Sequence, residues 1–239
     1  MNKKIAILIS SVIASVGGLV TTQAVQAGVS ANVALTTHYI FRGQDISSRE
    51  PAIQGGFDYS HANGLYTGIW ASSANTGTET DGTIEMDYYI GYSREFSEYG
   101  VGIDFGYVQY DYPHTGTDDN EIYGVVSYSF GESGDLSASF WLELDDSTII
   151  VDGEESASGG NAGTFTYMNV GYTLPLPNKF EFEFATGYQT YDDDTDGVKD
   201  YMLSISRPFG GVDLALSYSD SDAEVDKSNF FTLTLAKSL

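Results

Sequence analysis

The segment Thr83-Ile-Glu-Met-Asp-Tyr-Tyr-Ile-Gly-Tyr92 alternates residue by residue between two kinds of side chain. In an extended chain, successive side chains point to opposite faces. One face would carry Ile84, Met86, Tyr88, Ile90 and Tyr92, and the other would carry Glu85, Asp87, Tyr89 and Gly91. A helix has a different period and would scatter the carboxylates around its axis. The segment is therefore predicted to be a β-strand with one apolar face.

The same alternation recurs throughout the chain. For example, Glu181 and Glu183 separate three phenylalanines. A tilted strand needs only about 9–11 residues to cross a membrane, so short segments suffice. Twelve segments are predicted to be strands: Ser30–Arg42, Ala52–His61, Gly64–Ser73, Thr83–Arg94, Gly100–Asp111, Asn120–Phe130, Asp135–Asp145, Gly163–Leu174, Lys179–Thr190, Val198–Pro208, Gly211–Asp220 and Asp226–Leu239.

The connections between these segments alternate in length. Short links such as Pro175-Leu-Pro-Asn178 are typical of tight turns. Long polar links take every second position: Gly43–Pro51, Ala74–Gly82, Tyr112–Asp119, Asp146–Ala162, Tyr191–Gly197 and Ser221–Val225. This order puts all tight turns at one end of the strands and all long loops at the other, as in outer-membrane barrels. A Greek-key sandwich has no such requirement.

These patterns predict an all-β fold, a transmembrane antiparallel β-barrel of about 12 strands whose apolar face meets lipid. Arg94, Arg207 and Lys237 fall on the apolar face at the short-turn end. There, their stems can lie on apolar surface while their charges reach the membrane interface. The alternative is a soluble periplasmic β-protein, in which the apolar face would form a core.

The first 27 residues have the features of a secretory signal. Two lysines precede an apolar run (Ile5–Val20), and small residues lead up to a cleavage point after Ala27. The run is shorter than the roughly 20 residues that a membrane-spanning helix needs. We therefore expect a signal peptide at 1–27 and an outer-membrane barrel at 28–239.

Charge and composition exclude several classes of protein. The chain carries 34 acidic and 10 basic side chains, and loss of Lys3 and Lys4 with the signal would take the net charge from −24 to −26. Nucleic acid is excluded as a partner, because binding it requires Lys and Arg at the phosphates. Aromatic residues make up 14% of the chain, which argues against disorder. Cysteine is absent, so strand pairing and burial must hold the fold.

Alternation also assigns charged residues to the inner face of the barrel. They are predicted to line a pore: Arg42, Asp58, Glu85, Asp87, Asp104, Glu143, Glu181, Glu183 and Asp213. Carboxylates on the wall bias passage toward cations, so we expect a passive, cation-preferring channel for small hydrophilic solutes. The alternative is a closed, filled barrel whose acidic loops bind divalent ions, lipopolysaccharide or a surface partner.

Arg42 is the one cation expected on this inner face near the long-loop end. It would lie level with Glu85, Asp87 and Glu143, so we expect it to pair with one or more of them and to narrow the outer mouth. A long loop such as Asp146–Ala162 is a candidate for a plug that folds into the barrel.

The loop Asp192-Asp-Asp-Thr-Asp-Gly197 matches the opening of an EF-hand, with Asp192, Asp194 and Asp196 at its first, third and fifth places. The twelfth place holds Leu203 instead of the bidentate Glu, so an EF-hand is not expected. A weaker loop-bound Ca²⁺ or Mg²⁺ is the alternative, and no other cofactor is expected.

Catalysis is not expected. The three histidines, His38, His61 and His114, lie on separate segments, and no His-x-x-x-His pair occurs. No Gly-x-Ser-x-Gly motif is present. Strand placement puts His38 in the lumen near mid-strand, whereas a hydrolase that acts on membrane lipid needs a site on the lipid face.

Five motifs carry a resemblance to a known family. They are Tyr39-Ile-Phe-Arg-Gly43, Pro51-Ala-Ile-Gln-Gly55, Gly64-Leu-Tyr-Thr-Gly-Ile-Trp-Ala-Ser72, Glu85-Met-Asp-Tyr-Tyr-Ile-Gly91 and Tyr110-Asp-Tyr-Pro113. These segments resemble the Gram-negative porins called TorF-like or Gcw_chp, most strongly over Ala31–Pro113. The resemblance implies an outer-membrane location and a pore, without enzymatic activity and without a particular solute.

Overall fold

The computed structural model describes residues 27–75, 84–113, 117–144, 165–191, 196–223 and 229–239. Within these ranges, twelve long strands close into an antiparallel barrel, and two very short strands form a separate hairpin. The barrel strands are β1 (Gly28–Thr36), β4 (Ala52–Ser60), β5 (Leu65–Ser72), β6 (Glu85–Phe96), β7 (Val101–Tyr112), β8 (Thr117–Ser129), β9 (Asp135–Glu143), β10 (Phe165–Leu176), β11 (Phe180–Tyr191), β12 (Val198–Phe209), β13 (Val212–Ser221) and β14 (Phe230–Ser238). The expected signal peptide lies outside the described residues, apart from Ala27.

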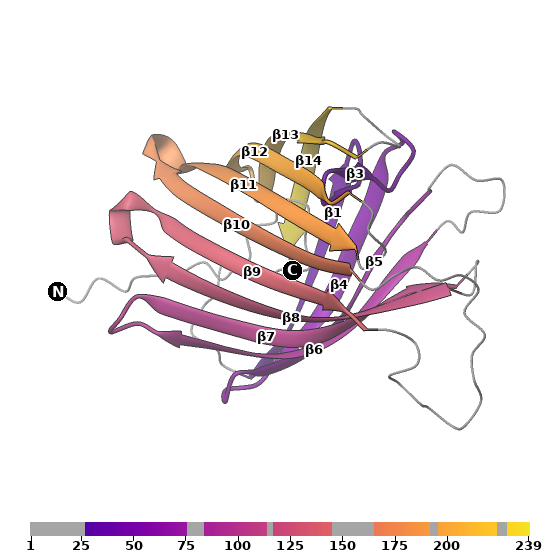
Figure 1. Cartoon of the computed structure of the whole chain (residues 1–239). Helices are drawn as coiled ribbons and strands as arrows, with labels where there is room; N and C mark the ends of the chain where they lie inside the picture. Colours follow the sequence, from indigo (N-terminus) through magenta and orange to yellow (C-terminus); the bar gives the residue numbers. More distant parts are fainter. Residues whose placement is uncertain (1–26, 76–83, 114–116, 145–164, 192–195, 224–228) are drawn as a thin grey trace, which may run out of the picture.

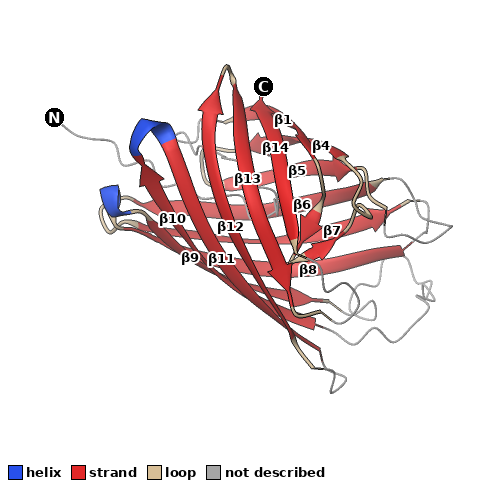
Figure 2. Cartoon of the chain, turned by 90° about the horizontal axis from the view of Figure 1, so that it is seen from above, coloured by secondary structure: helices blue, strands red, loops and turns tan. Residues whose placement is uncertain are grey.

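Consecutive strands pair with one another around the barrel, and the ends of the chain close it. β1 pairs with β4 on one side and with β14 on the other, where Leu35 lies opposite Leu235. Figures 1 and 2 show the strands wound obliquely around a common interior. Closure matters in a membrane because lipid cannot satisfy the N–H and C=O groups of an exposed strand edge. The predicted twelve-strand barrel is confirmed.

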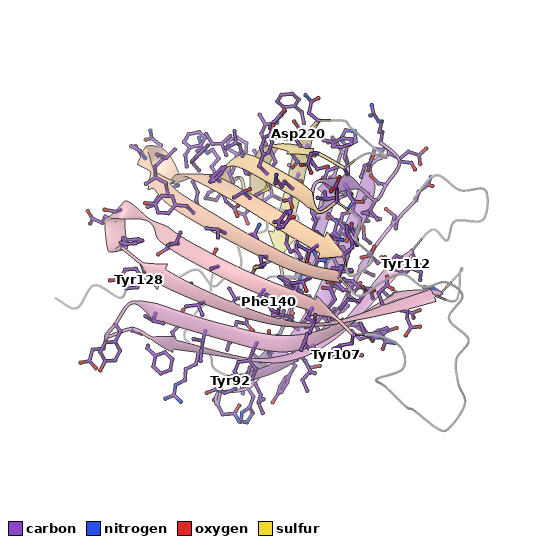
Figure 3. The ribbon with its side chains drawn as sticks, in the orientation of Figure 1. Tyr92, Tyr107, Tyr112, Tyr128, Phe140 and Asp220 are labelled. Atoms are coloured by element: carbon purple, nitrogen blue, oxygen red, sulfur yellow. The ribbon has the colours of Figure 1, made fainter. Side chains whose placement is uncertain are left out.

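The outer face of the barrel is apolar, as alternation predicts. On β6, Tyr88 and Ile90 are 39% and 57% exposed, whereas Glu85 and Asp87 are 2% and 1% exposed. Every barrel strand shows large apolar side chains on its outer face. Figure 3 shows one of them, Tyr92, projecting away from the interior. So large an apolar surface is unusual on a soluble monomer but is the lipid contact of a membrane barrel.

The two ends of the barrel differ, and Tyr112 and Tyr128 lie toward opposite ends (Figure 3). Tight turns follow β4, β6, β8, β10 and β12, two of them as 3₁₀ turns, η1 (Gly131–Ser133) and η3 (Pro177–Lys179). At this end the Arg94 guanidinium lies over the Phe96 ring, as expected for a cation at a membrane interface. No helix in the described ranges is long and apolar enough to span a membrane.

One connection departs from the expected alternation of lengths. β7 ends at Tyr112 and β8 begins at Thr117, so a link of four residues, 113–116, stands where a long loop was expected. The polar residues of the predicted loop extend the strand instead, because Asp118 pairs opposite Asp111 on β7. Strand pairing here overrides the turn preference of an Asp-Asp-Asn run.

The first strand is shorter than predicted. β1 ends at Thr36, so the prediction that the first barrel strand continues to Arg42 is wrong. The alternation runs on past Thr36 without a turn residue before Gly43, and it therefore gave no sign of the strand end. His38 lies after the strand instead of in its middle, and its ring centroid is 6.0 Å from that of Phe230.

Candidate functional site

The chain after β1 turns into the barrel and forms a small hairpin. β2 (Ile40–Phe41) pairs with β3 (Gln44–Asp45). The two residues between them, Arg42 and Gly43, both have positive φ, 49° and 76°. This is the backbone of a tight type I′ turn, in which Gly is favoured. We call residues 37–47 the inward segment.

Arg42 anchors the inward segment to the far wall. Its Nη1 and Nη2 donate hydrogen bonds to Oε1 and Oε2 of Glu121, at 2.9 and 2.8 Å. Glu121 belongs to β8, which lies almost diametrically opposite β1 in the closed strand order. The two side chains are 6% and 2% exposed. Removing one partner of such a buried bidentate pair costs about 3–5 kcal/mol.

Aromatic rings surround the Arg42 guanidinium. Its Cζ lies 4.6 Å from the ring centroid of Phe41, 5.4 Å from Trp141, 5.2 Å from Phe165 and 4.5 Å from Tyr167. Ring faces attract a cation, most strongly when water is excluded. Among the described residues, Arg42 is the only buried Lys or Arg. The positive charge of the described interior is therefore concentrated at this point.

Two further contacts hold the inward segment in place. The Tyr39 hydroxyl donates a hydrogen bond to Oε1 of Glu85 on β6, at 2.9 Å. On the other side, Gly43 lies against β12 and β13, where an added Cβ would be 2.8 Å from the Cβ atoms of Asp200 and Ser221. The inward segment thus contacts several walls at once and narrows the lumen at the long-loop end.

Tyrosine rings lie flat along the inner wall, over glycines. Tyr66 on β5, Gly91 on β6, Gly106 on β7 and Tyr123 on β8 are successive cross-strand partners. The two rings cover the two glycines, and their hydroxyl groups meet over them. A Cβ on Gly106 would lie 2.6 Å from the Tyr123 hydroxyl oxygen, so the row requires glycine. Tyr123 also stacks on Trp141 of β9, with centroids 4.5 Å apart.

Tyrosines also donate hydrogen bonds to the inner carboxylates. The pairs are Tyr89 with Asp58, Tyr66 with Asp104, Tyr39 with Glu85, Tyr110 with Glu121, and Tyr167 with Asp200. In the first pair, the Tyr89 ring passes over its cross-strand partner Gly68 to reach Asp58. A phenol donates a hydrogen bond without bringing a charge. Each of these five carboxylates therefore accepts at least one hydrogen bond while the wall stays negative.

All eight carboxylates predicted for the interior face inward, opposite to the exposed apolar residues of their own strands: Asp58, Glu85, Asp87, Asp104, Glu143, Glu181, Glu183 and Asp213. Glu85 and Asp87 are fully buried at the level of the inward segment. Glu181, Glu183 and Asp213, near the short turns, are half-buried. That these residues line a conducting pore stays a prediction.

The partner of Arg42 differs from the expected ones. Arg42 is hydrogen-bonded to Glu121 and not to Glu85, Asp87 or Glu143. The reason is that Arg42 leaves the wall with the inward segment and crosses the lumen. Glu143 instead accepts a hydrogen bond from the backbone N–H of Phe165, at 3.1 Å.

Sequence reasoning missed Glu121 and Asp200. Both lie close to acidic stretches that look like loops, at 118–120 and 192–197. A signal was available for Glu121, because Tyr123 and Val125 share its parity and are buried with it. The tyrosine partners of the carboxylates were also missed, since cross-strand rows depend on which strands pair and in which register.

The loop residues singled out for metal binding are only partly described. Asp192 and Asp194 lie outside the described residues, and Asp196 is exposed. Within the described ranges, no group of three or more His, Asp or Glu is placed to hold a metal ion. His114 and the proposed plug Asp146–Ala162 also lie outside them.

His61 sits in a tight turn, with its Nδ1 2.8 Å from Oδ1 of Asn63.

Solved structures with a similar fold are outer-membrane barrels. The structure named KdgM porin is 6% identical, with a TM-score of 0.59, and the match covers 87% of this chain and 97% of that chain. The COG4313 outer membrane channel from Pseudomonas putida F1 is 12% identical, with a TM-score of 0.51 and coverage of 90% and 96%. At such identities the likeness concerns the fold alone. No curated protein sequence matches this chain.

The family comparison covers nearly the whole chain. The model of the family described as "Bacterial protein of unknown function (Gcw_chp)" matches residues 21–237. The motif Tyr39–Gly43, which suggested this family, forms the tip of the inward segment. The resemblance to Gcw_chp is thus confirmed, and the chain belongs to the Gcw_chp family.

Proposed function

We propose that this protein is an outer-membrane porin, a passive channel for small hydrophilic solutes that prefers cations. The observation that carries the proposal is the closed twelve-strand barrel with an apolar outside and carboxylates inside. Barrels of about eight strands are filled by their own side chains, whereas those of about sixteen leave a water-filled channel. A twelve-strand barrel lies between these cases, so the contents of its lumen decide its width. Among the described residues, the inward segment is the part of the chain that crosses the lumen.

The charge of the inner wall supports the cation preference. Glu121 neutralises Arg42, the only buried cation of the described chain. The half-buried Glu181, Glu183 and Asp213 leave negative charge near the short-turn end of the lumen. A negatively lined passage with walls of low dielectric concentrates cations and repels anions.

The Glu181→Gln/Glu183→Gln variant should lose part of this preference. In planar bilayers with a KCl gradient, the reversal potential of the wild type should have the sign that indicates a preference for K⁺ over Cl⁻. The reversal potential of the variant should be closer to zero, because two negative charges of the wall are gone. Glu98→Gln, which neutralises an exposed acid in a tight turn, serves as the control and should keep the wild-type value. Anion preference in the wild type would contradict the proposal.

A closed barrel is the second candidate, and the burial of the inner wall beside the inward segment favours it. Thr36 is 3% exposed and Ser72 is 1% exposed, although both are small wall residues facing inward. On this alternative, the wild type passes no current while the inward segment is seated. Single-channel recordings of the wild type separate the two candidates directly.

The location can be tested in cells that express the full chain. An outer-membrane barrel should need detergent for extraction and should migrate differently on gels before and after boiling, because the closed sheet resists cold detergent. A soluble periplasmic protein would instead appear in the osmotic-shock fraction. Sequencing the N-terminus of the extracted protein tests the predicted cleavage after Ala27.

A further inference from the structure

Two carboxylate oxygens on β6 are buried without a hydrogen-bond partner. They are Oε2 of Glu85 and Oδ1 of Asp87, which are shielded from solvent. The two residues are 2% and 1% exposed. Because they are two positions apart on one strand, their side chains leave the same face of the sheet. A buried carboxylate oxygen without a partner is unfavourable, so this pair requires an explanation.

Among the residues that the structure describes, the neighbours of Glu85 and Asp87 supply no positive charge. Asp87 lies between its cross-strand partners Trp70 on β5 and Tyr110 on β7. Glu85 receives a hydrogen bond from Tyr39 on Oε1 and also interacts with Tyr112. These neighbours are neutral aromatic side chains. They can orient the carboxylates, but they cannot neutralise them.

The balance of charge is negative. The charges of Glu85 and Glu121 both act on Asp87. The buried cation nearby, Arg42, is already held by both oxygens of Glu121. The charge of Arg42 also acts on Glu143 and Asp200, so within the described residues no cation compensates the two charges of Glu85 and Asp87. Like charges buried together need a counterion or protons.

We propose that Glu85 and Asp87 bind a divalent cation, Ca²⁺ or Mg²⁺, inside the barrel at the level of the inward segment. Both ions prefer hard oxygen ligands, and Mg²⁺ in particular is often held by one or two carboxylates while water fills its other positions. One divalent ion would supply the two missing positive charges. The proposal goes beyond the channel function and does not require that the barrel conduct.

Terbium luminescence tests the site in the purified, detergent-solubilised protein. Tb³⁺ takes the place of Ca²⁺ among oxygen ligands, and it emits after energy transfer from a tryptophan only at short range. Trp70 is the direct cross-strand partner of Asp87, so excitation of tryptophan should give a saturable Tb³⁺ signal that Ca²⁺ or Mg²⁺ reverses. Asp87→Asn and Glu85→Gln should each weaken Tb³⁺ binding at least about tenfold.

Matched variants separate this site from the many other acids of the chain. Glu183→Gln removes an inner carboxylate near the other end of the barrel. It should leave Tb³⁺ affinity within about twofold of wild type, because Glu183 does not contact the proposed ligands Glu85 and Asp87. Replacing Asp192, Asp194 and Asp196 with Asn should also leave the tryptophan-sensitised signal in place. Trp70→Phe should reduce the emission without changing the affinity measured by calorimetry.

Heat-modifiable migration checks that each variant is folded before binding is measured. If Asp87→Asn fails to fold, Glu85→Gln and Trp70→Phe still decide the question. No saturable emission from the wild type, or unchanged affinity in folded Asp87→Asn or Glu85→Gln, overturns the proposal. In that case protons shared between the two carboxylates would account for the unpaired oxygens.

Discussion

Arg42→Ala should conduct several-fold more current per channel than the wild type in planar bilayers. The guanidinium is the link between the inward segment and the far wall, through Glu121 and the surrounding rings. Its loss leaves Glu121 buried without its partner, which costs about 3–5 kcal/mol. That cost shifts the equilibrium from the seated to the released segment by about two to four orders of magnitude. The lumen then widens at the level of the inward segment.

Two other variants define what the Arg42 result means. Arg49→Ala changes an exposed arginine just beyond the inward segment and should leave conductance unchanged. Arg42→Lys keeps the charge but cannot form the bidentate pair, so its conductance should fall between those of the wild type and Arg42→Ala. Equal single-channel currents in Arg42→Ala and the wild type would show that the inward segment does not control the lumen.

Gly68→Ala should destabilise the folded barrel by about 1–3 kcal/mol, the usual effect of forcing a methyl group into filled space. The new Cβ would meet the Tyr89 ring and lie 2.7 Å from the carbonyl oxygen of Phe57. The tyrosine would have to lift away, and Asp58 would lose its hydrogen bond. The expected result is a lower urea midpoint for loss of the folded gel band.

Gly124→Ala is the matched control for this substitution. Gly124 lies within β8, and an added Cβ there meets no atom within 4 Å. The control should be as stable as the wild type or slightly more stable, because Ala restricts the unfolded chain more than Gly does. Equal urea midpoints for the two alanine variants would contradict the role assigned to the row of Asp58, Gly68 and Tyr89.

The inside and outside of the barrel could be predicted from the sequence because a strand has a period of two. Glu85 and Tyr88 differ in parity, and that alone places one in the lumen and the other in lipid. The eight inner carboxylates followed from the same rule. The tight turns were also predictable, because Gly, Pro and Asn mark them locally.

The inward segment was not predictable by these means. The chain leaves the barrel wall after Thr36 because of contacts with strands that are far away in the sequence, such as the contact of Arg42 with Glu121. No local pattern encodes a contact across the lumen. The partner of Arg42 was mispredicted for the same reason, since a residue assigned to the wall was expected to pair along the wall.

The rows of tyrosine over glycine also bear on how the barrel avoids misassembly. If β6 slipped by two residues against β5, the Tyr89 ring would meet Tyr66 or Trp70, which face inward on either side of Gly68. A slip of one residue would turn the ring out into the lipid. Only the native alignment leaves an empty place beneath the ring. The rows therefore select the native register of the strands, because the tyrosine rings can pack on the inner wall only when each lies over its glycine.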